Sequence, residues 1–303
     1  MGGGKRALFF AGIVLGLSSF AGGAVKELPL PDVPAEMKAP GDRAAYIMRH
    51  FWDGMDWGDT TMTRDEAFLE QNAVNFFSLF PHADSLAVSA AVDTLLVRGS
   101  ADSVAVEILA GLAGQYLYER ESPVWHEAGY EIMAREMLAC AALPPEERLR
   151  IEARLEGLAK NRPGMPATDF GFVARDGSRS TLHETVGGTD KCVLVFYDPD
   201  CDNCNNLERQ LAADRRISEA MANGALKVML ITPFAVDNPV WRRHAATLPE
   251  TWVVGYSPEG AVDTGELYDL LSMPTIYLLS PSPVVHTRNA SPKQIQLFVS
   301  DCE

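Results

Sequence analysis

Apolar positions recur at helical spacing along the first half of the chain. Between residues 42 and 160 they stand three and four positions apart, as in "ADSLAVSAAVDTLLVRG", a pattern typical of amphipathic helices. We expect five or six helices with short connections, and a capping box of Thr63 and Glu66 in front of one of them. The sequence therefore predicts an all-α N-terminal helical domain over residues 42–160.

A different pattern follows "NRPGMPATDF", whose prolines and glycine end the helical block. Short runs of branched and aromatic residues lie at 192–197, 226–231, 251–256, 275–280 and 284–288. Helix-like stretches separate some of these runs, which is typical of an α/β sheet. Only "PSP" separates the last two runs, so they should form an antiparallel hairpin at one edge. Residues 161–303 therefore predict an α/β domain with a central mixed sheet.

The N-terminus is typical of an export signal. Lys5 and Arg6 precede an uncharged run over residues 7–24, whose last small residues offer a cleavage site near Ala24. If this run were not cleaved, it would tether the protein to a membrane, since it just reaches the length of a spanning helix. We expect a signal peptide over residues 1–24, an extended linker over residues 25–41, and an exported, periplasmic protein with no membrane span in its mature form.

Charge narrows the range of partners. The chain has 26 Lys and Arg against 41 Asp and Glu, a formal charge of −15. Nucleic acids and anionic membranes bind clustered basic residues, so neither is an expected partner.

Cysteines are few but unevenly spaced. The chain has five, at positions 140, 192, 201, 204 and 302, too few for a disulfide-stapled scaffold. Cys201 and Cys204 form a Cys-x-x-Cys pair after a predicted strand, which could be half a zinc site, an inert disulfide or a redox pair. Zinc needs four ligands, and His183, His244 and His286 are scattered singly, so we expect no metal.

The position of the pair favours redox chemistry. Cys201 would lie at the start of a helix, where the helix dipole favours a thiolate, and Cys204 would lie one turn further on. Cys201 could then attack a disulfide, and Cys204 could resolve the mixed disulfide. We expect Cys140 and Cys192 to be core residues, and Cys302 to be free or to bridge to another chain.

Residues 161–303 resemble the thioredoxin fold, and within it the exported disulfide reductases of the TlpA/ResA type. "CVLVFYDPDCDNC" is similar to the strand and active-site loop of that family, with Tyr197 where a tryptophan is usual. "GMPATDFGFVARDGSRSTL" is similar to the extra N-terminal hairpin of the subfamily. "SMPTIYLL" matches the loop that carries a cis-proline beside the cysteines, which implies that Pro274 is that residue.

The resemblance implies a thiol–disulfide oxidoreductase that uses no cofactor. Its partners would be protein disulfides or dithiols and an electron donor that the sequence does not identify. Cys201 and Cys204 would be catalytic, while Pro274, Thr275 and Tyr197 would shape a groove for an extended peptide. The remaining residues of the implied active-site loop are Asp198, Pro199, Asp200, Asp202 and Asn203.

Several positions depart from the family pattern. Asp202 and Asn203 replace the usual Gly-Pro or Pro-His between the cysteines, Asp200 replaces a tryptophan, and Val195 replaces a buried carboxylate. The helical half resembles an uncharacterised domain found ahead of such modules in exported bacterial proteins, which implies no function. The alternative to an enzyme is therefore a non-catalytic binding or assembly protein with a thioredoxin-like scaffold.

Acidic residues around the pair predict the direction of electron flow. Asp198, Asp200 and Asp202 flank Cys201, and each nearby carboxylate disfavours a second negative charge. A less stabilised thiolate makes the disulfide harder to reduce. We therefore expect a reductant or an isomerase and not a strong oxidant.

Overall fold

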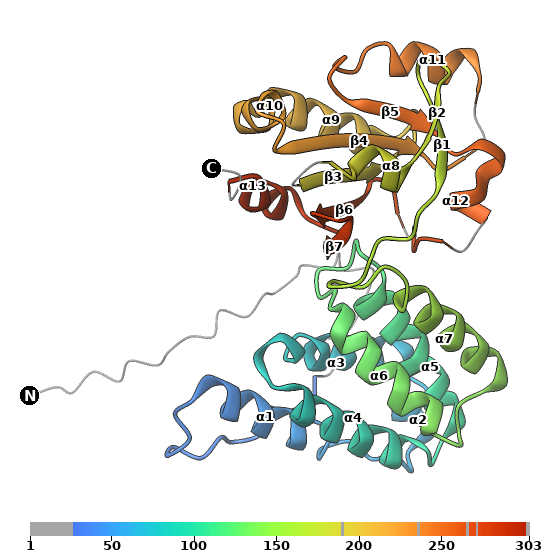
Figure 1. Cartoon of the computed structure of the whole chain (residues 1–303). Helices are drawn as coiled ribbons and strands as arrows, with labels where there is room; N and C mark the ends of the chain where they lie inside the picture. Colours follow the sequence, from blue (N-terminus) through green and yellow to red (C-terminus); the bar gives the residue numbers. More distant parts are fainter. Residues whose placement is uncertain (1–26, 189–190, 235–236, 265–266, 271, 301–303) are drawn as a thin grey trace, which may run out of the picture.

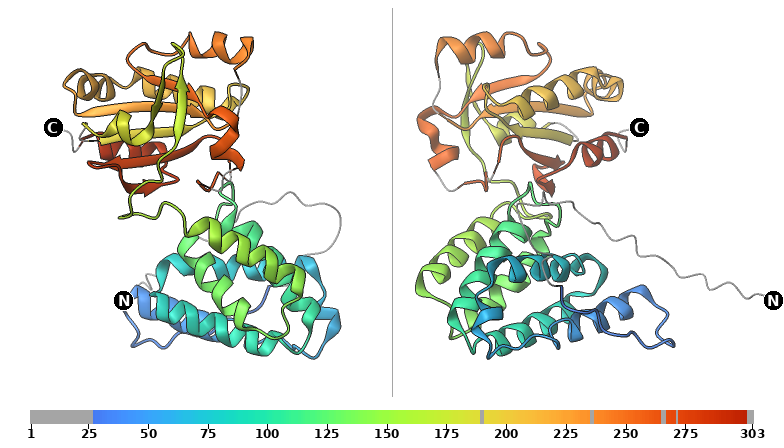
Figure 2. Two further views of the ribbon diagram at one scale, coloured as in Figure 1. Left: turned by 45° about the vertical axis from the view of Figure 1, so that its right-hand side comes forward. Right: turned by 180° about the vertical axis from the view of Figure 1, so that it is seen from behind.

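The computed structural model describes residues 27–188, 191–234, 237–264, 267–270 and 272–300. The expected signal peptide and its cleavage site, and also Cys302, lie outside the described residues. Within them, the chain forms a helical region followed by a sheet region, stacked on each other as Figures 1 and 2 show.

The helical region packs around one apolar core. Its elements are α1 (Pro40–His50), α2 (Thr60–Thr63), α3 (Glu66–Phe77), a 3-10 turn (Phe80–His82), α4 (Ser85–Gly99), α5 (Ser103–Ala113), a π-helical turn (Gly114–Tyr118), α6 (Glu127–Ala139) and α7 (Pro145–Leu158). The described part thus has seven α-helices where we expected five or six, because α2 is a single turn and α1 precedes the clearest periodic pattern. Leu28, in the segment expected to be an extended linker, is buried in the same core.

The predicted capping box is wrong. Helix α3 begins after Asp65, whose carboxylate accepts a hydrogen bond from the Phe68 N–H at 3.1 Å. Thr63 is instead buried at the end of α2, and its hydroxyl donates to the Asp102 carboxylate at 2.7 Å. Aspartate caps a helix at least as well as threonine, so the acceptor adjacent to the helix takes the position.

The sheet region contains one seven-stranded mixed sheet, in agreement with the predicted fold class. Its strands are β1 (Gly171–Ala174), β2 (Arg179–Thr181), β3 (Lys191–Phe196), β4 (Leu226–Thr232), β5 (Val253–Tyr256), β6 (Thr275–Ser280) and β7 (Val284–Arg288), in the order β2-β1-β5-β4-β3-β6-β7. Strands β3, β4 and β5 are parallel, and the other pairings are antiparallel. The predicted β6–β7 hairpin is confirmed at one edge, and the β1–β2 hairpin at the other.

Two layers of helices cover the two faces of this sheet. Successive side chains of a strand point to opposite faces, so Val193 and Val195 of β3 face one layer while Cys192, Leu194 and Phe196 face the other. The first layer contains α9 (Asp202–Ala213), α10 (Arg215–Ala222), α11 (Pro239–Ala245) and α13 (Pro292–Ser300). The second contains α8 (Leu182–Val186) and α12 (Ala261–Thr264).

The segment that joins the two regions is attached to the edge of the sheet. The Gly164 N–H donates to the Val285 carbonyl at 2.7 Å, and the Val285 N–H donates to the Met165 carbonyl at 2.8 Å. The Ala167 N–H donates to the Pro283 carbonyl at 2.8 Å. The joining segment therefore covers part of β7, an edge strand that would otherwise expose unpaired backbone groups.

An ion pair between a buried arginine and a partly exposed glutamate connects the two regions. Arg288 of β7 has a side chain only 4% exposed, and its guanidinium contacts the Glu127 carboxylate of α6 at 2.6 Å. It also donates to the carbonyl oxygens of Leu158 at 2.6 Å and Lys160 at 2.8 Å. Burial and the nearby Glu127 carboxylate raise the pKa of Asp269 in the same cluster. One arginine thus pairs acceptors from two helices and the joining segment.

We predict that Arg288→Met lowers the free energy of unfolding by roughly 3–5 kcal/mol, since it leaves Glu127 and two carbonyl oxygens without their donor. Urea unfolding followed by circular dichroism measures the loss. The matched control is Arg98→Met, because Arg98 and its partner Asp53 are both substantially exposed. That control should lose at most about 1 kcal/mol. Equal losses in the two variants would contradict the role given to Arg288.

Candidate active site

The cysteine pair lies where β3 passes into α9. Cys201 is the N-cap residue of α9, with an extended backbone, and its Sγ accepts a hydrogen bond from the Cys204 N–H at 3.3 Å. Cys201 is partly exposed, whereas Cys204 is only 1% exposed. The two sulfur atoms therefore differ in access to solvent although they lie within one helical turn.

Short-range hydrogen bonds hold the loop before Cys201. The Cys201 N–H donates to the Asp198 carbonyl at 3.1 Å, and the Asp198 carboxylate accepts from the Asp200 N–H at 2.9 Å. Pro199 is partly buried, whereas Asp200, Asp202 and Asn203 are exposed. Water and salt therefore screen the charges of the two exposed carboxylates from the thiol.

The loop that precedes β6 lies against the first cysteine. The peptide bond between Met273 and Pro274 is cis, as the family resemblance predicted. The Cys201 thiol lies 3.5 Å from the Met273 carbonyl oxygen, to which it donates. Thr275 is fully buried at the start of β6, opposite Phe196 in the antiparallel register, so the expectation that it lines a substrate groove does not fit its position. Cys201 and Pro274, which are far apart in the sequence, thus lie together where β3 ends and β6 begins.

Tyr197 lies beneath this site and not at its surface. Its side chain is fully buried, its hydroxyl accepts a hydrogen bond from the Trp241 indole N–H at 3.1 Å, and burial raises its pKa to about 12. Its ring also packs on the imidazole of His244, with ring centroids 5.6 Å apart. The expectation that Tyr197 lines a substrate groove therefore does not fit its position, because no part of the side chain is exposed to a substrate.

The second cysteine is a protonated thiol at neutral pH. Burial raises the pKa of Cys204, and its interaction with the Cys201 side chain raises that pKa further. A buried carboxylate lies on the same helix, since Glu208 follows Cys204 by four residues and pairs with His244 of α11. This pair was not predicted from the sequence, although the four-residue spacing places Glu208 and Cys204 on one helix face.

The other described cysteines lie apart from the pair. Cys192 faces the opposite side of the sheet, and burial raises its pKa to about 12. Cys140 ends α6 in the helical region and is partly exposed. All four described cysteines are free thiols.

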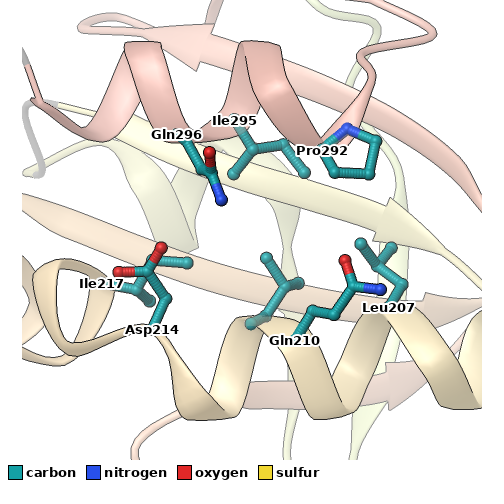
Figure 3. Close-up of a pocket in the computed structure, with 8 residues that line it drawn as sticks. Leu207, Gln210, Asp214, Ile217, Pro292, Ile295 and Gln296 are labelled. Carbon is teal, nitrogen blue, oxygen red and sulfur yellow. The ribbon is translucent and has the colours of Figure 1, made fainter.

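The surface between α9 and α13 is only slightly hollowed. A cleft of about 20 Å³ opens between α9 and α13, lined by Leu207 and Ile295 among others, and holds little more than one water molecule (Figure 3). Within the described ranges, no three His, Cys, Asp or Glu side chains are arranged so that they could hold a metal ion. None of the helices in that part of the chain combines the length and apolar character that crossing a membrane requires.

Comparison with known proteins identifies the fold. A solved structure of a thioredoxin-like protein from Bacteroides caccae matches with a TM-score of 0.82 and 28% identity, over 92% of this chain and 100% of that one. The C-terminal region is therefore a thioredoxin-like domain, and the helical region precedes it in both proteins. A family model described as a domain of unknown function, DUF5106, matches residues 17–161, and hence the helical region.

Other comparisons cover only part of the chain. A conserved protein of unknown function from Bacteroides fragilis matches 46% of this chain and 98% of its own, with 33% identity and a TM-score of 0.43. A thiol-disulfide oxidoreductase from Bacteroides fragilis matches 46% of this chain and 99% of its own, with 19% identity and a TM-score of 0.38. No curated protein matches the chain.

We predict that iodoacetamide modifies Cys201 of the reduced protein well before Cys204. Cys204 is buried, and its raised pKa keeps it protonated, so its modification should become appreciable only at strongly alkaline pH or after unfolding. Mass spectrometry of cysteine-containing peptides at pH 7 measures the order, with buried Cys192 as the internal control for intact protein. Equal modification of Cys201 and Cys204 while Cys192 stays unmodified would contradict the assignment.

Proposed function

We propose that this protein is an exported thiol–disulfide oxidoreductase that reduces or isomerises protein disulfides through Cys201 and Cys204. The observation that carries the proposal is the position of Cys201: it is partly exposed, caps α9, and contacts the loop of the cis-proline Pro274. N–H groups at a helix start favour negative charge, and Cys201 is the residue at the start of α9.

The proposed reaction uses the difference between the two thiols. The Cys201 thiolate attacks one sulfur of a substrate disulfide, and the other substrate sulfur leaves as a thiolate. Cys204 then loses its proton and attacks Cys201 Sγ, which forms the Cys201–Cys204 disulfide and releases the second substrate thiolate. Two electrons pass to the substrate, and an external dithiol donor must restore the reduced pair. In isomerisation, the substrate thiolate that is released first attacks a disulfide before Cys204 attacks Cys201.

The substrate would lie along the start of β6. Pro274 marks this position, and the Met273 carbonyl is 3.5 Å from the attacking sulfur. An extended peptide that follows the loop would therefore present its disulfide to Cys201. The exported location rests on the N-terminal sequence pattern, and an uncleaved segment would leave the protein tethered to a membrane.

An inert disulfide in a binding protein is the alternative function. A purely structural pair needs neither an exposed first sulfur nor contact with the cis-proline loop, and Cys201 has both. The unequal burial of the two cysteines therefore favours the enzyme.

Reduction of insulin disulfides by the purified protein, with dithiothreitol as electron donor, tests the proposal. We predict that turbidity from the released insulin B chain appears well before it does in a blank with dithiothreitol alone. In Cys201→Ser, the rate should fall to that of the blank. The control Cys140→Ser removes a partly exposed thiol of the helical region and should keep wild-type activity. If the wild-type protein were no faster than Cys201→Ser with several reductants, the binding function would be favoured instead.

A further inference from the structure

Asn161 is a buried asparagine in the joining segment, shortly after α7 ends. Its φ is 47°, in the left-handed region that asparagine tolerates better than most residues, and it is only 6% exposed. Its amide connects two separate segments. The Oδ1 atom accepts from the Thr168 N–H at 2.7 Å, and Nδ2 donates to the Leu267 carbonyl at 2.7 Å. Asn161 therefore attaches the joining segment to the loop before β6.

The loop before β6 has further contacts with the same part of the chain. Directly after Leu267, the Tyr268 hydroxyl donates to the Thr168 carbonyl at 2.6 Å. A Cβ atom at Gly157 of α7 would lie 3.4 Å from Asp269 Oδ1, so the helix packs directly on this carboxylate. Three consecutive loop residues thus contact α7 or the joining segment.

The other end of this loop contacts the first cysteine. The Met273 carbonyl, six residues after that of Leu267, accepts from the Cys201 thiol at 3.5 Å. Between these points, the Tyr268 ring packs on Phe196 at the end of β3, with ring centroids 4.8 Å apart. The loop therefore extends from the Asn161 contact to the sulfur that would attack a substrate.

The helical region also reaches the strand beside β6. Arg120, which follows the π-helical turn, donates through Nη2 to the Asn289 carbonyl at 3.1 Å. The next residue, Ala290, donates its N–H to the Ile276 carbonyl at 3.0 Å, close to the start of β6. The ion pair of Arg288 lies one residue before Asn289. Contacts from outside the sheet thus reach both the loop that leads into β6 and the strand next to it.

We propose that Asn161 is a positioning residue: by donating to the Leu267 carbonyl, it holds the loop before β6 where that loop aligns a protein substrate with Cys201. Through this contact, the helical region and the joining segment take part in substrate docking. The inference rests on the proposed function for the identity of the substrate, whereas the attachment of the loop is tested without it.

A positioning role and a merely local role of Asn161 need different ends of its amide. If Asn161 only shapes the joining segment, it needs Oδ1 and the contact with Thr168. If it holds the loop, it also needs the Nδ2 donor. Asn161→Asp separates the two roles, because aspartate tolerates the same φ and keeps an acceptor for the Thr168 N–H. An ionised carboxylate cannot donate to the Leu267 carbonyl.

Hydrogen exchange of the reduced full chain, followed by mass spectrometry, tests the attachment. In Asn161→Asp, peptides from the loop before β6 should exchange roughly two- to tenfold faster, the change expected for one lost hydrogen bond of ordinary strength. Peptides that contain Thr168 should keep the wild-type rate. Asn161→Gly removes both contacts without backbone strain and should accelerate both sets. The control Asn75→Asp makes the same change on α3, where the side chain accepts from Gln71, and should alter neither set.

A second variant removes a different contact of the same loop. Tyr268→Phe deletes the hydroxyl that donates to Thr168 and keeps the ring that packs on Phe196, so the loop should again exchange faster. Wild-type exchange of the loop in Asn161→Asp would overturn the proposal. Equal acceleration along the whole chain would also overturn it, because the loss would then be one of global stability.

Comparison of a protein disulfide with a small one tests the docking role. In the proposed function insulin lies along the loop, whereas 5,5′-dithiobis(2-nitrobenzoate) needs only the accessible Cys201 thiol. In a background in which Cys140 and Cys302 are alanine, Asn161→Asp should raise KM for insulin by the same factor as loop exchange. The value of kcat and the rate with the small disulfide should stay near the wild type.

Two outcomes of this comparison separate the docking role from the proposed function. Equal losses with both disulfides would place the defect at the thiol pair and overturn the docking role. If the wild-type protein reduced insulin no faster than Cys201→Ser, the proposed function would fail, and the exchange result would still decide whether Asn161 holds the loop.

Discussion

The N-cap residue of helix α9 is Cys201, so a sulfur atom accepts the capping hydrogen bond. The Cys204 N–H donates to Cys201 Sγ, whereas α3 and α4 begin on the carboxylates of Asp65 and Asp84. Strand β3 lies in the interior of the sheet, and the chain passes from its carboxyl end into α9. The sulfur therefore lies at that end of the sheet, partly exposed and beside the cis-proline loop. The same cap turns Cys204 inward toward the apolar layer. The proposed chemistry depends on this difference between an accessible and a shielded thiol.

The helical region is connected to the loop that Cys201 contacts. Between α12 and β6, Leu267 accepts a hydrogen bond through its carbonyl from the Asn161 side chain at 2.7 Å. The Tyr268 hydroxyl donates to the Thr168 carbonyl at 2.6 Å, and five residues later the Met273 carbonyl contacts the Cys201 thiol. Together with Arg288, these contacts tie the end of α7, the joining segment and the active-site loop into one polar interface. Asn161 and Thr168 thus attach the joining segment to residues before the cis-proline loop, and Arg288 attaches the helical region to β7.

Local patterns in the sequence predicted the mixed sheet, the β6–β7 hairpin and the helical N-terminal half, and the family resemblance predicted the cis peptide bond at Pro274. Contacts between distant residues could not be predicted in this way. His244 stands alone in the sequence and meets Glu208 only because α11 packs beside α9. Arg288 likewise occurs in an ordinary edge strand, and its pairing with Glu127 spans two domains. Tyr197 was misplaced because the resemblance gave its position in the chain and not its burial.

The central claim is that Cys201 and Cys204 form a reversible redox couple of low potential. Equilibration of the mature protein with glutathione buffers, followed by acid quench and mass spectrometry of the two cysteines, measures the potential directly. Burial of Cys204 raises its pKa and disfavours a thiolate there, so the potential should lie nearer the roughly −270 mV of thioredoxin than the roughly −120 mV of DsbA. A potential above about −180 mV, the value of protein disulfide isomerase, or no disulfide between the two cysteines in any buffer, would contradict the account.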